Sequence, residues 1–401
     1  MPVARELRVL TVGNMYPPHH LGGYELMWRS SVEHLRARGA EVRVLTTDHR
    51  EPEPDAAFPE DPDAHRELRW YWYDHEFPRR GLGKRLRIER SNLATLERHL
   101  DELRPDAVCW WAMGGMSMSL VERGRRLGMP AVGVVVDEWL GYGPRVDAWQ
   151  RAFGRPLALA LAVERLSGVP TALDLAGAAR WVFVSDYLRE RARAAGVDPF
   201  DSEVAHGGVD RPSFPVAPER PWQGRLLYLG RIDERKGIET AIRALADLEQ
   251  ATLRVIGSGD RDYAERLRRL VADLGFAARV SFEVLPRDRV GAAYAEADAV
   301  LFPVLWPEPW GLVPLEAMSV GRPVVATGTG GSAEYLRDGE NCLLFEPHDS
   351  PTALAAAVRR LADDDGLRRT LRAGGLDAAR AHTEESFNEA VAGALADVVA
   401  R

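Results

Sequence analysis

The sequence of 401 residues is poor in cysteine: it contains only Cys109 and Cys342, far apart in the chain. Two distant thiols predict neither a disulfide framework nor a thiolate metal site. No apolar run approaches the roughly 18 residues of a membrane helix. The charged stretch from Met1 to Arg8 lacks the apolar core of a signal peptide. We therefore expect a soluble cytoplasmic protein with no integral membrane segment.

The chain also lacks an excess of positive charge. Lysine and arginine total 52 against 60 aspartate and glutamate residues, which gives a formal net charge of -8. An acidic surface repels nucleic acid, so we expect no nucleic-acid partner. Lysine is almost missing, because every basic residue except Lys84 and Lys236 is arginine. Such a skew reflects coding bias. A position that still holds lysine is therefore a weak indication that lysine has a specific role there.

What is present is typical of a globular α/β protein, with 46% hydrophobic and 28% charged residues. Short apolar runs alternate with helical patterns over residues 7–184 and again over residues 225–362. Three prolines within residues 212–218 mark a linker between these two series. The pattern predicts two Rossmann-like doubly wound domains, residues 1–210 and 211–383, facing across a cleft. In such sheets ligands bind beyond the carboxyl ends of the strands.

Two carboxylates in the second series are the strongest chemical signal. Glu308 lies in a loop after a predicted strand, and Glu316 lies about one turn into the next predicted helix. The first amides of a helix have no partner within it, so they can hold a phosphate between two groups that accept hydrogen bonds from sugar hydroxyls. A turn cap at Glu308 and a surface charge at Glu316 are the plain structural alternative.

A second signal is a charged turn at the end of a predicted strand, in which Arg231 and Lys236 are the two candidate cations. It reads Gly230-Arg231-Ile-Asp-Glu-Arg-Lys236-Gly237. Two cations in this place can clamp a diphosphate, which would otherwise require a divalent metal. The rare lysine at position 236 favours a role for a compact ammonium group. A solvated charged turn is the structural alternative.

Glycine-rich loops give weaker signals. Gly22-Gly23 precedes a predicted helix and would let the backbone approach a phosphate at its N-terminus. Gly257-Ser-Gly259 matches only a fragment of the dinucleotide fingerprint. The sequence contains no H-E-x-x-H, no paired C-x-x-C, no complete P-loop and no G-x-S-x-G elbow. These absences count against zinc-protease and P-loop functions.

Together these motifs resemble the retaining GT-B glycosyltransferases, specifically the large family four group (glycosyl transferases group 1). The resemblance runs from Pro17 to Glu334 and is most specific in the segment from Glu308 to Val325, EPWGLVPLEAMSVGRPVV. It implies that the second domain binds a nucleotide-sugar donor and that the first mostly binds the acceptor. It also implies that a last helix, about residues 384–401, crosses back to the first domain.

The resemblance implies roles for individual residues. Arg231 and Lys236 would bind the donor diphosphate and stabilise its charge as it leaves. Glu308 would contact sugar hydroxyls near the reacting carbon, and Glu316 would bind the ribose hydroxyls. The backbone would contribute further donor contacts through Gly22, Gly23, Gly230, Leu312 and Val313. The implied mechanism is same-face substitution through an oxocarbenium-like state, with no metal ion and no cofactor besides the donor substrate.

The sequence departs from the family at one position. In many relatives the strand that ends here near Val136 closes with a histidine followed by aspartate, and that histidine approaches the donor sugar. This chain reads Val136-Asp137-Glu138-Trp139. We therefore expect a different environment around C6 of the donor sugar. Either the sugar is a deoxy sugar or a pentose, or Asp137 or Glu138 takes the place of the histidine.

Other functions of this fold stay open at this point. A nucleotide-sugar epimerase or hydrolase would use the donor without an acceptor. An inactive sugar-nucleotide-binding subunit is disfavoured because four charged candidate residues are all present: Arg231, Lys236, Glu308 and Glu316. Val136 in place of the family histidine keeps this alternative open. A nicotinamide oxidoreductase is disfavoured by the incomplete glycine fingerprint.

The sequence does not identify the acceptor or the oligomeric state. The strand-like aromatic cluster from Trp70 to Tyr73, with Phe77 and Trp110-Trp111, could stack on sugar rings, but burial in the core is the more common use of such residues. The basic stretch from Arg79 to Arg90 leaves an anionic acceptor or a peripheral membrane contact open. A solvated helix face is its default interpretation.

Overall fold

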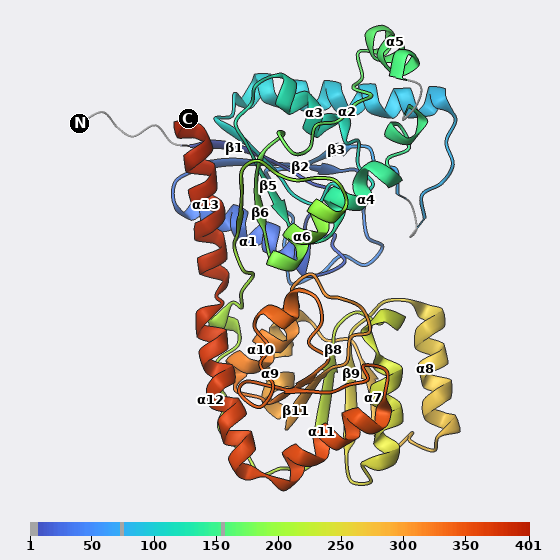
Figure 1. Cartoon of the computed structure of the whole chain (residues 1–401), viewed down its shortest axis with the longest axis vertical. Coiled ribbons are helices and arrows are strands. Elements are labelled where there is room, and N and C mark those ends of the chain that lie inside the picture. Colours follow the sequence, from blue (N-terminus) through green and yellow to red (C-terminus); the bar gives the residue numbers. More distant parts are fainter. Residues whose placement is uncertain (1–6, 73–75, 154–156) are drawn as a thin grey trace, which may run out of the picture. The chain divides into compact units, whose positions relative to one another are not determined.

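A computed structural model describes residues 7–72, 76–153 and 157–401 (Figure 1). The chain divides into two compact units, one formed by residues 1–205 and 388–401 and the other by residues 206–387. The domain boundaries expected from the sequence, after residues 210 and 383, lie close to these divisions. Each unit is an α/β structure with its own parallel sheet.

The first unit contains a seven-stranded parallel sheet in the order β3-β2-β1-β4-β5-β6-β7. Its strands are β1 (Arg8–Val12), β2 (Glu41–Thr47), β3 (Ala64–Leu68), β4 (Ala107–Trp110), β5 (Ala131–Val135), β6 (Arg180–Phe183) and β7 (Ser202–Val204). Its helices are α1 (Gly23–Ala37), α2 (Leu82–Leu103), α3 (Ser119–Arg126), α4 (Trp139–Val146), α5 (Leu157–Ser167) and α6 (Asp186–Ala194). β4 and β5 are buried along their whole length, as expected for strands covered on both faces.

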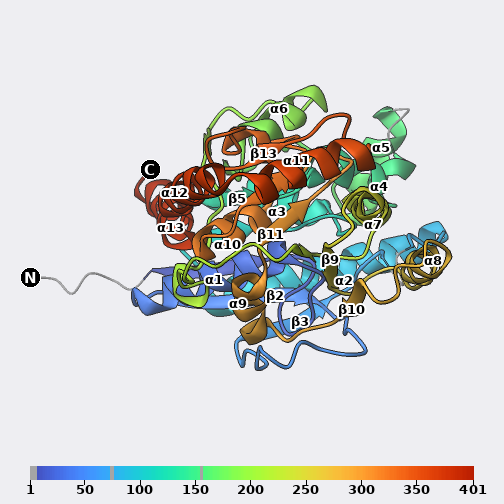
Figure 2. The same cartoon turned by 90° about the horizontal axis from the view of Figure 1, so that it is seen from below.

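The second unit contains a six-stranded parallel sheet in the order β10-β9-β8-β11-β12-β13. Its strands are β8 (Arg225–Leu229), β9 (Thr252–Ile256), β10 (Val280–Glu283), β11 (Ala299–Phe302), β12 (Val324–Ala326) and β13 (Leu343–Leu344). Its helices are α7 (Ile238–Ala244), α8 (Arg261–Asp273), α9 (Arg287–Glu296), α10 (Leu312–Val320), α11 (Pro351–Asp363) and α12 (Asp365–Ala381). α7 packs against α8 and α11, whereas α10 packs against α9 and α12, so two groups of helices enclose the sheet (Figures 1 and 2).

The last helix, α13 (Glu384–Ala400), belongs to both units, because the division falls between Phe387 and Asn388. In the first unit, Ser31 Oγ donates to Asn388 Oδ1 over 2.6 Å, and the side chains of Val391 and Leu395 are buried. The predicted crossing of the last helix back to the first domain is confirmed.

The two segments that connect the units run side by side in the second unit. The amide of Val209 donates to the carbonyl of His382 over 3.1 Å, and the amide of Glu384 donates to the carbonyl of Val209 over 3.2 Å. A Cβ atom on Gly208 would come within 2.1 Å of the Thr383 carbonyl carbon. Only glycine therefore allows this close backbone approach.

The expected strand at Trp70 to Tyr73 is wrong. The edge strand β3 lies a few residues earlier, at Ala64–Leu68, and residues 70–72 are not in a strand. Tyr73 lies outside the described residues. The indole of Trp70 instead donates to the carbonyl of Gly114 over 3.1 Å, so the aromatic cluster packs on a loop rather than along a sheet. Among the described residues, we find no helix with the length and apolar character that crossing a membrane requires.

Candidate functional site

The candidate site of the second unit is built where β8 and β11 end. Gly230, Arg231 and Lys236 follow β8, with Lys236 in the short 3-10 helix Glu234–Lys236. Gly237 ends this turn with φ = 68°, and a Cβ atom there would lie 1.9 Å from the carbonyl oxygen of Pro303. Only glycine fits this left-handed, crowded position, and it seats the Lys236 turn against the chain just beyond β11.

Lys236 and Glu308 form an ion pair at this edge of the sheet. The Lys236 side chain is 18% exposed and the Glu308 side chain is 8% exposed. Because both groups are largely withdrawn from water, their attraction is screened less than that of a surface pair. Two residues to which the resemblance assigns separate tasks are therefore direct partners in the structure.

Arg231 is more open than Lys236. Its side chain is 40% exposed, and its Nη2 atom lies 3.5 Å from Asp233 Oδ2. Hydrogen bonding from Arg235 holds the pKa of Asp233 down at about 2. Asp233 therefore stays ionised at neutral pH, between the guanidinium groups of Arg231 and Arg235.

Glu316 is held from two sides within the second unit. Arg287 Nη2 donates to Glu316 Oε1 and the Tyr294 hydroxyl donates to Glu316 Oε2, each over 2.8 Å. The side chain of Glu316 is 5% exposed, and its charge raises the pKa of Arg287. The arrangement fixes the direction of the carboxylate, and each oxygen keeps a second lone pair for another donor.

The N-terminus of α10 lies between the two glutamates in the sequence. Gly311 precedes the helix with φ = 88° and provides no side-chain cap. The amides of Leu312 and Val313 belong to the first turn of α10, whose N–H groups have no partners within the helix. Such amides form an anion-binding site together with the positive end of the helix dipole.

Aromatic packing fixes the loop before α10. The ring of Trp310 stacks on His206, with centroids 4.6 Å apart and an interplanar angle of 12°. The ring of Tyr335 lies tilted against Trp310 with centroids 4.9 Å apart, and its hydroxyl donates to the carbonyl of Gly311. The backbone amide of Gly331 donates to the carbonyl of Glu308 over 2.7 Å. These contacts hold the Glu308 loop in one position before any ligand binds.

The glycine loop of the first unit opens α1. The amide of Gly22 donates to Glu25 Oε2 over 3.1 Å, and burial raises the pKa of Glu25 to about 7. A Cβ atom on Gly22 would meet nothing within 4 Å. There is therefore open space beside the α-carbon of Gly22, and Gly23 begins the helix.

Asp137 and Glu138 already have partners within the first unit. Asp137 accepts from the Trp139 amide over 3.0 Å and from the Tyr142 hydroxyl over 2.7 Å, and burial raises its pKa to about 6. Glu138 accepts from Arg191 over 3.0 Å. Both carboxylates thus support the local structure beside Val136.

The structure brings part of the predicted set together. Seven of its residues lie in one unit, at the turn after β8, in the loop after β11 and in α10: Gly230, Arg231, Lys236, Glu308, Leu312, Val313 and Glu316. Gly22, Gly23, Asp137 and Glu138 belong to the other unit. Arg287 and Tyr294, which hold Glu316, were not predicted, and no sequence motif marks them.

Comparison with known families identifies the chain. Residues 214–376 match the model of glycosyl transferases group 1, and residues 21–211 match the model of Glycosyltransferase Family 4. The chain belongs to the group 1 glycosyltransferases of the GT-B fold. The sequence-based recognition of this family and its fold is confirmed.

Curated relatives of this glycosyltransferase match over part of their length. A D-inositol 3-phosphate glycosyltransferase of Acidothermus cellulolyticus is 37% identical over 187 residues, which cover 44% of this chain and 41% of the relative. A glycogen synthase of Mycobacterium tuberculosis is 36% identical over 172 residues, which cover 40% of each chain. The matched part thus spans about two fifths of the relatives' length.

Solved structures share the fold of the glycosyltransferase over almost the whole chain. Sucrose-phosphate synthase from Thermosynechococcus elongatus has a TM-score of 0.73 at 20% identity and covers 98% of this chain and 100% of its own. Anabaena Alr3699/HepE, solved in complex with UDP and glucose, has a TM-score of 0.70 at 19% identity and covers 98% of this chain and 100% of its own.

Proposed function

We propose that this glycosyltransferase moves a sugar from a nucleotide diphosphate donor to a hydroxyl of a small-molecule, saccharide or lipid-linked acceptor, with retention and without a metal ion. The unit of residues 206–387 binds the donor, and the first unit binds mostly the acceptor. The main support for the proposal is the Lys236–Glu308 ion pair, which lies where β8 and β11 end.

The cations and amides of the second unit act on the leaving group. Arg231 and Lys236 bind the diphosphate and offset the charge that grows on it as the glycosidic bond breaks. The amides of Leu312 and Val313 add donors that need no reorganisation during the reaction. Positive charge from these side chains does the work that a divalent metal would otherwise do.

The Lys236–Glu308 pair links diphosphate binding to sugar binding. When a diphosphate arrives, its oxygens compete with Glu308 for the ammonium of Lys236. Glu308 then has lone pairs free for hydroxyls of the sugar next to the diphosphate. Glu316 keeps its contacts with Arg287 and Tyr294 and accepts from the ribose hydroxyls with its remaining lone pairs.

The relatives support the donor class more than the acceptor. Alr3699/HepE has been solved with UDP-glucose. The curated relatives include both an inositol-phosphate glycosyltransferase and a glycogen synthase, so they do not select one acceptor chemistry. The acceptor therefore stays unassigned among sugar, polyol and lipid-linked hydroxyls.

The first experiment is a thermal-shift panel of nucleoside diphosphates and their sugars, because a ligand that binds the native state raises its melting temperature. The donor that emerges is then assayed with acceptors, and the anomeric configuration of the product is read by NMR. Donor alone is incubated in parallel, since free sugar or epimer without acceptor would favour the hydrolase or epimerase alternative.

The decisive variant is the double substitution Arg231→Ala, Lys236→Ala. We expect it to fold and to lose transfer by at least about a thousandfold, since each removed donor at a developing charge costs about a hundredfold. Arg243→Gln is the matched control, because Arg243 is an exposed arginine of α7 paired with Glu239. Undiminished transfer in the double variant would overturn the proposal.

A further inference from the structure

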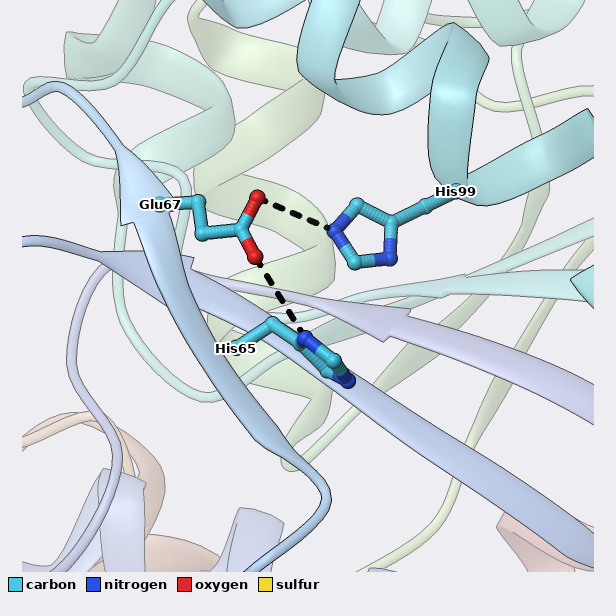
Figure 3. A group of neighbouring side chains, drawn as sticks. All are labelled: His65, Glu67 and His99. Atoms are coloured by element: carbon cyan, nitrogen blue, oxygen red, sulfur yellow. Dashed lines mark hydrogen bonds and ion pairs between the residues drawn. The ribbon is translucent and has the colours of Figure 1, made fainter. Parts of the chain in front are cut away.

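Two histidines and a glutamate converge on the edge of the first sheet (Figure 3). His65 and Glu67 are two positions apart on β3, so their side chains leave the same face of the strand. His99 comes from α2 and points at them. His99 lies far from His65 and Glu67 in the sequence. None of the motifs assigned to sugar transfer includes these three residues.

The distances fit a shared ion. Glu67 Oε1 lies 3.4 Å from His65 Nδ1, and Glu67 Oε2 lies 3.4 Å from His99 Nε2. One ligand atom from each residue lies within 4.8 Å of the others. Ligand atoms at about 2.1 Å from a tetrahedral zinc ion are about 3.4 Å apart, so small side-chain rotations suffice.

We propose that His65, Glu67 and His99 bind one Zn²⁺ ion, with water as the fourth ligand. Two imidazoles and a carboxylate are a donor set that zinc accepts. The His65 and Glu67 side chains are 35% and 38% exposed, which gives an ion access from solvent, whereas His99 is fully buried. This site departs from the expectation that the chain holds no metal, and it lies apart from the residues assigned to transfer.

Arg98 competes with the ion for Glu67, and its Nη2 atom lies 3.4 Å from His99 Nε2. Arg43 contacts the other ring nitrogen of His99. Arg98 forms an ion pair with Glu67, and its side chain is 45% exposed and can swing into water. Arg43 Nη1 lies 3.3 Å from His99 Nδ1 but also donates to Glu102 over 3.1 Å. Without zinc, Arg98 neutralises the glutamate. When zinc binds, the ion takes the place of the Arg98 guanidinium at Glu67. Removal of Arg98 should therefore strengthen zinc binding.

The ion would join β3 to α2. Among the described residues, β3 is the edge strand of the first sheet and pairs with β2 alone, where the register shifts between Thr46 and Thr47. A ligand that binds only the folded arrangement stabilises it by mass action. Zinc would thus add a side-chain link to a strand that lies at the edge of the sheet.

The test uses the full-length protein without a histidine tag, stripped with chelator and titrated with Zn²⁺ alone by calorimetry. We expect one equivalent to bind and to raise the melting temperature. His65→Gln and Glu67→Gln should each weaken binding by at least about tenfold. These two are chosen because both side chains are partly exposed, so their loss should not prevent folding.

Two further variants complete the test. His49→Gln removes a histidine of the same unit that pairs with Glu51, outside the cluster, and should bind zinc like the wild type. Arg98→Gln should bind several times more tightly. A wild type that binds no zinc, or a His65→Gln or Glu67→Gln variant that binds it unchanged, overturns the proposal.

Discussion

Arg287 of α9 and Glu316 of α10 form an ion pair in which Nη2 lies 2.8 Å from Oε1. Glu316 is the residue that we propose for the donor ribose, and the orientation of its carboxylate depends on a side chain from the neighbouring helix. The Arg287 guanidinium also lies over the ring of Phe214, 5.0 Å from its centroid. Arg287 is therefore a positioning residue for Glu316.

Replacing Arg287 by methionine should release Glu316. We expect KM for the donor to rise about tenfold or more while kcat changes less, because the lost contact acts through ground-state donor binding. Stability should fall by about 1–3 kcal/mol, since the nearly buried carboxylate keeps only Tyr294. Arg289→Met on the same helix is the control, because Arg289 is exposed. Equal donor KM in both variants would contradict the role of Arg287.

Gly237 should tolerate no side chain. Gly237→Ala places a Cβ atom 1.9 Å from the Pro303 carbonyl oxygen at φ = 68°, whereas Gly275→Ala has φ = 73° and meets nothing within 4 Å. We expect Gly275→Ala to destabilise by about 1 kcal/mol through backbone strain alone, and Gly237→Ala by about 3–4 kcal/mol. Urea denaturation of the two variants separates steric crowding from strain. Similar midpoints would show that the Lys236 turn is not held against the segment after β11.

The stability of the first unit should depend on pH through Glu25. Burial raises its pKa from 4.5 to about 7, so the folded state retains a proton that the unfolded state loses. Its contribution is full below pH 4.5 and is lost as the pH rises to about 7. The loss amounts to about 3 kcal/mol. Glu25→Gln should remove this dependence when melting is followed across the range.

A control for that measurement lies on the same helix. Glu33 is exposed and pairs with Arg29, so Glu33→Gln should leave the pH profile of stability as in the wild type. If Glu25→Gln and the wild type lose stability in parallel between pH 4.5 and 7, burial of Glu25 does not drive the dependence.

Donor choice should reflect Val136. An aliphatic side chain offers no hydrogen bond, and Asp137 and Glu138 are already engaged with Tyr142 and Arg191. We expect faster turnover with nucleotide sugars that lack a 6-hydroxyl than with matched 6-hydroxy hexoses. A panel of such pairs measures the ratio of kcat/KM. A strong preference for 6-hydroxy hexoses would contradict the missing-hydroxyl hypothesis.

Strands β8 to β12 of the second unit could be predicted because they are short apolar runs between turn residues, whereas the two-residue strand β13 was missed. β11, for example, is buried at all four positions. β7 was missed, because Ser202–Val204 is only three residues long, half-buried and mostly polar. The aromatic run after β3 misled the assignment, since strand propensity at Trp70 reflects packing rather than backbone pairing.

The residues of the candidate site could be predicted where they belong to a sequence motif. The contacts between residues that are far apart in the sequence could not. The turn at Lys236 and the segment from Glu308 to Glu316 each stand out in the sequence, but their pairing joins residues 72 positions apart. Arg287 is one arginine among many and belongs to no motif. Only the packing of α9 against α10 shows what it does.

The shared helix α13 has a consequence for how the protein is made. Residues 1–205 leave the ribosome long before Asn388, yet Asn388 bonds to Ser31 of α1 and buried side chains follow it at Val391 and Leu395. The surface of the first unit that α13 covers is therefore exposed until residues 388–395 have been made. A chain that stops before α13 therefore leaves apolar surface of the first unit exposed, even though residues 1–205 are already present.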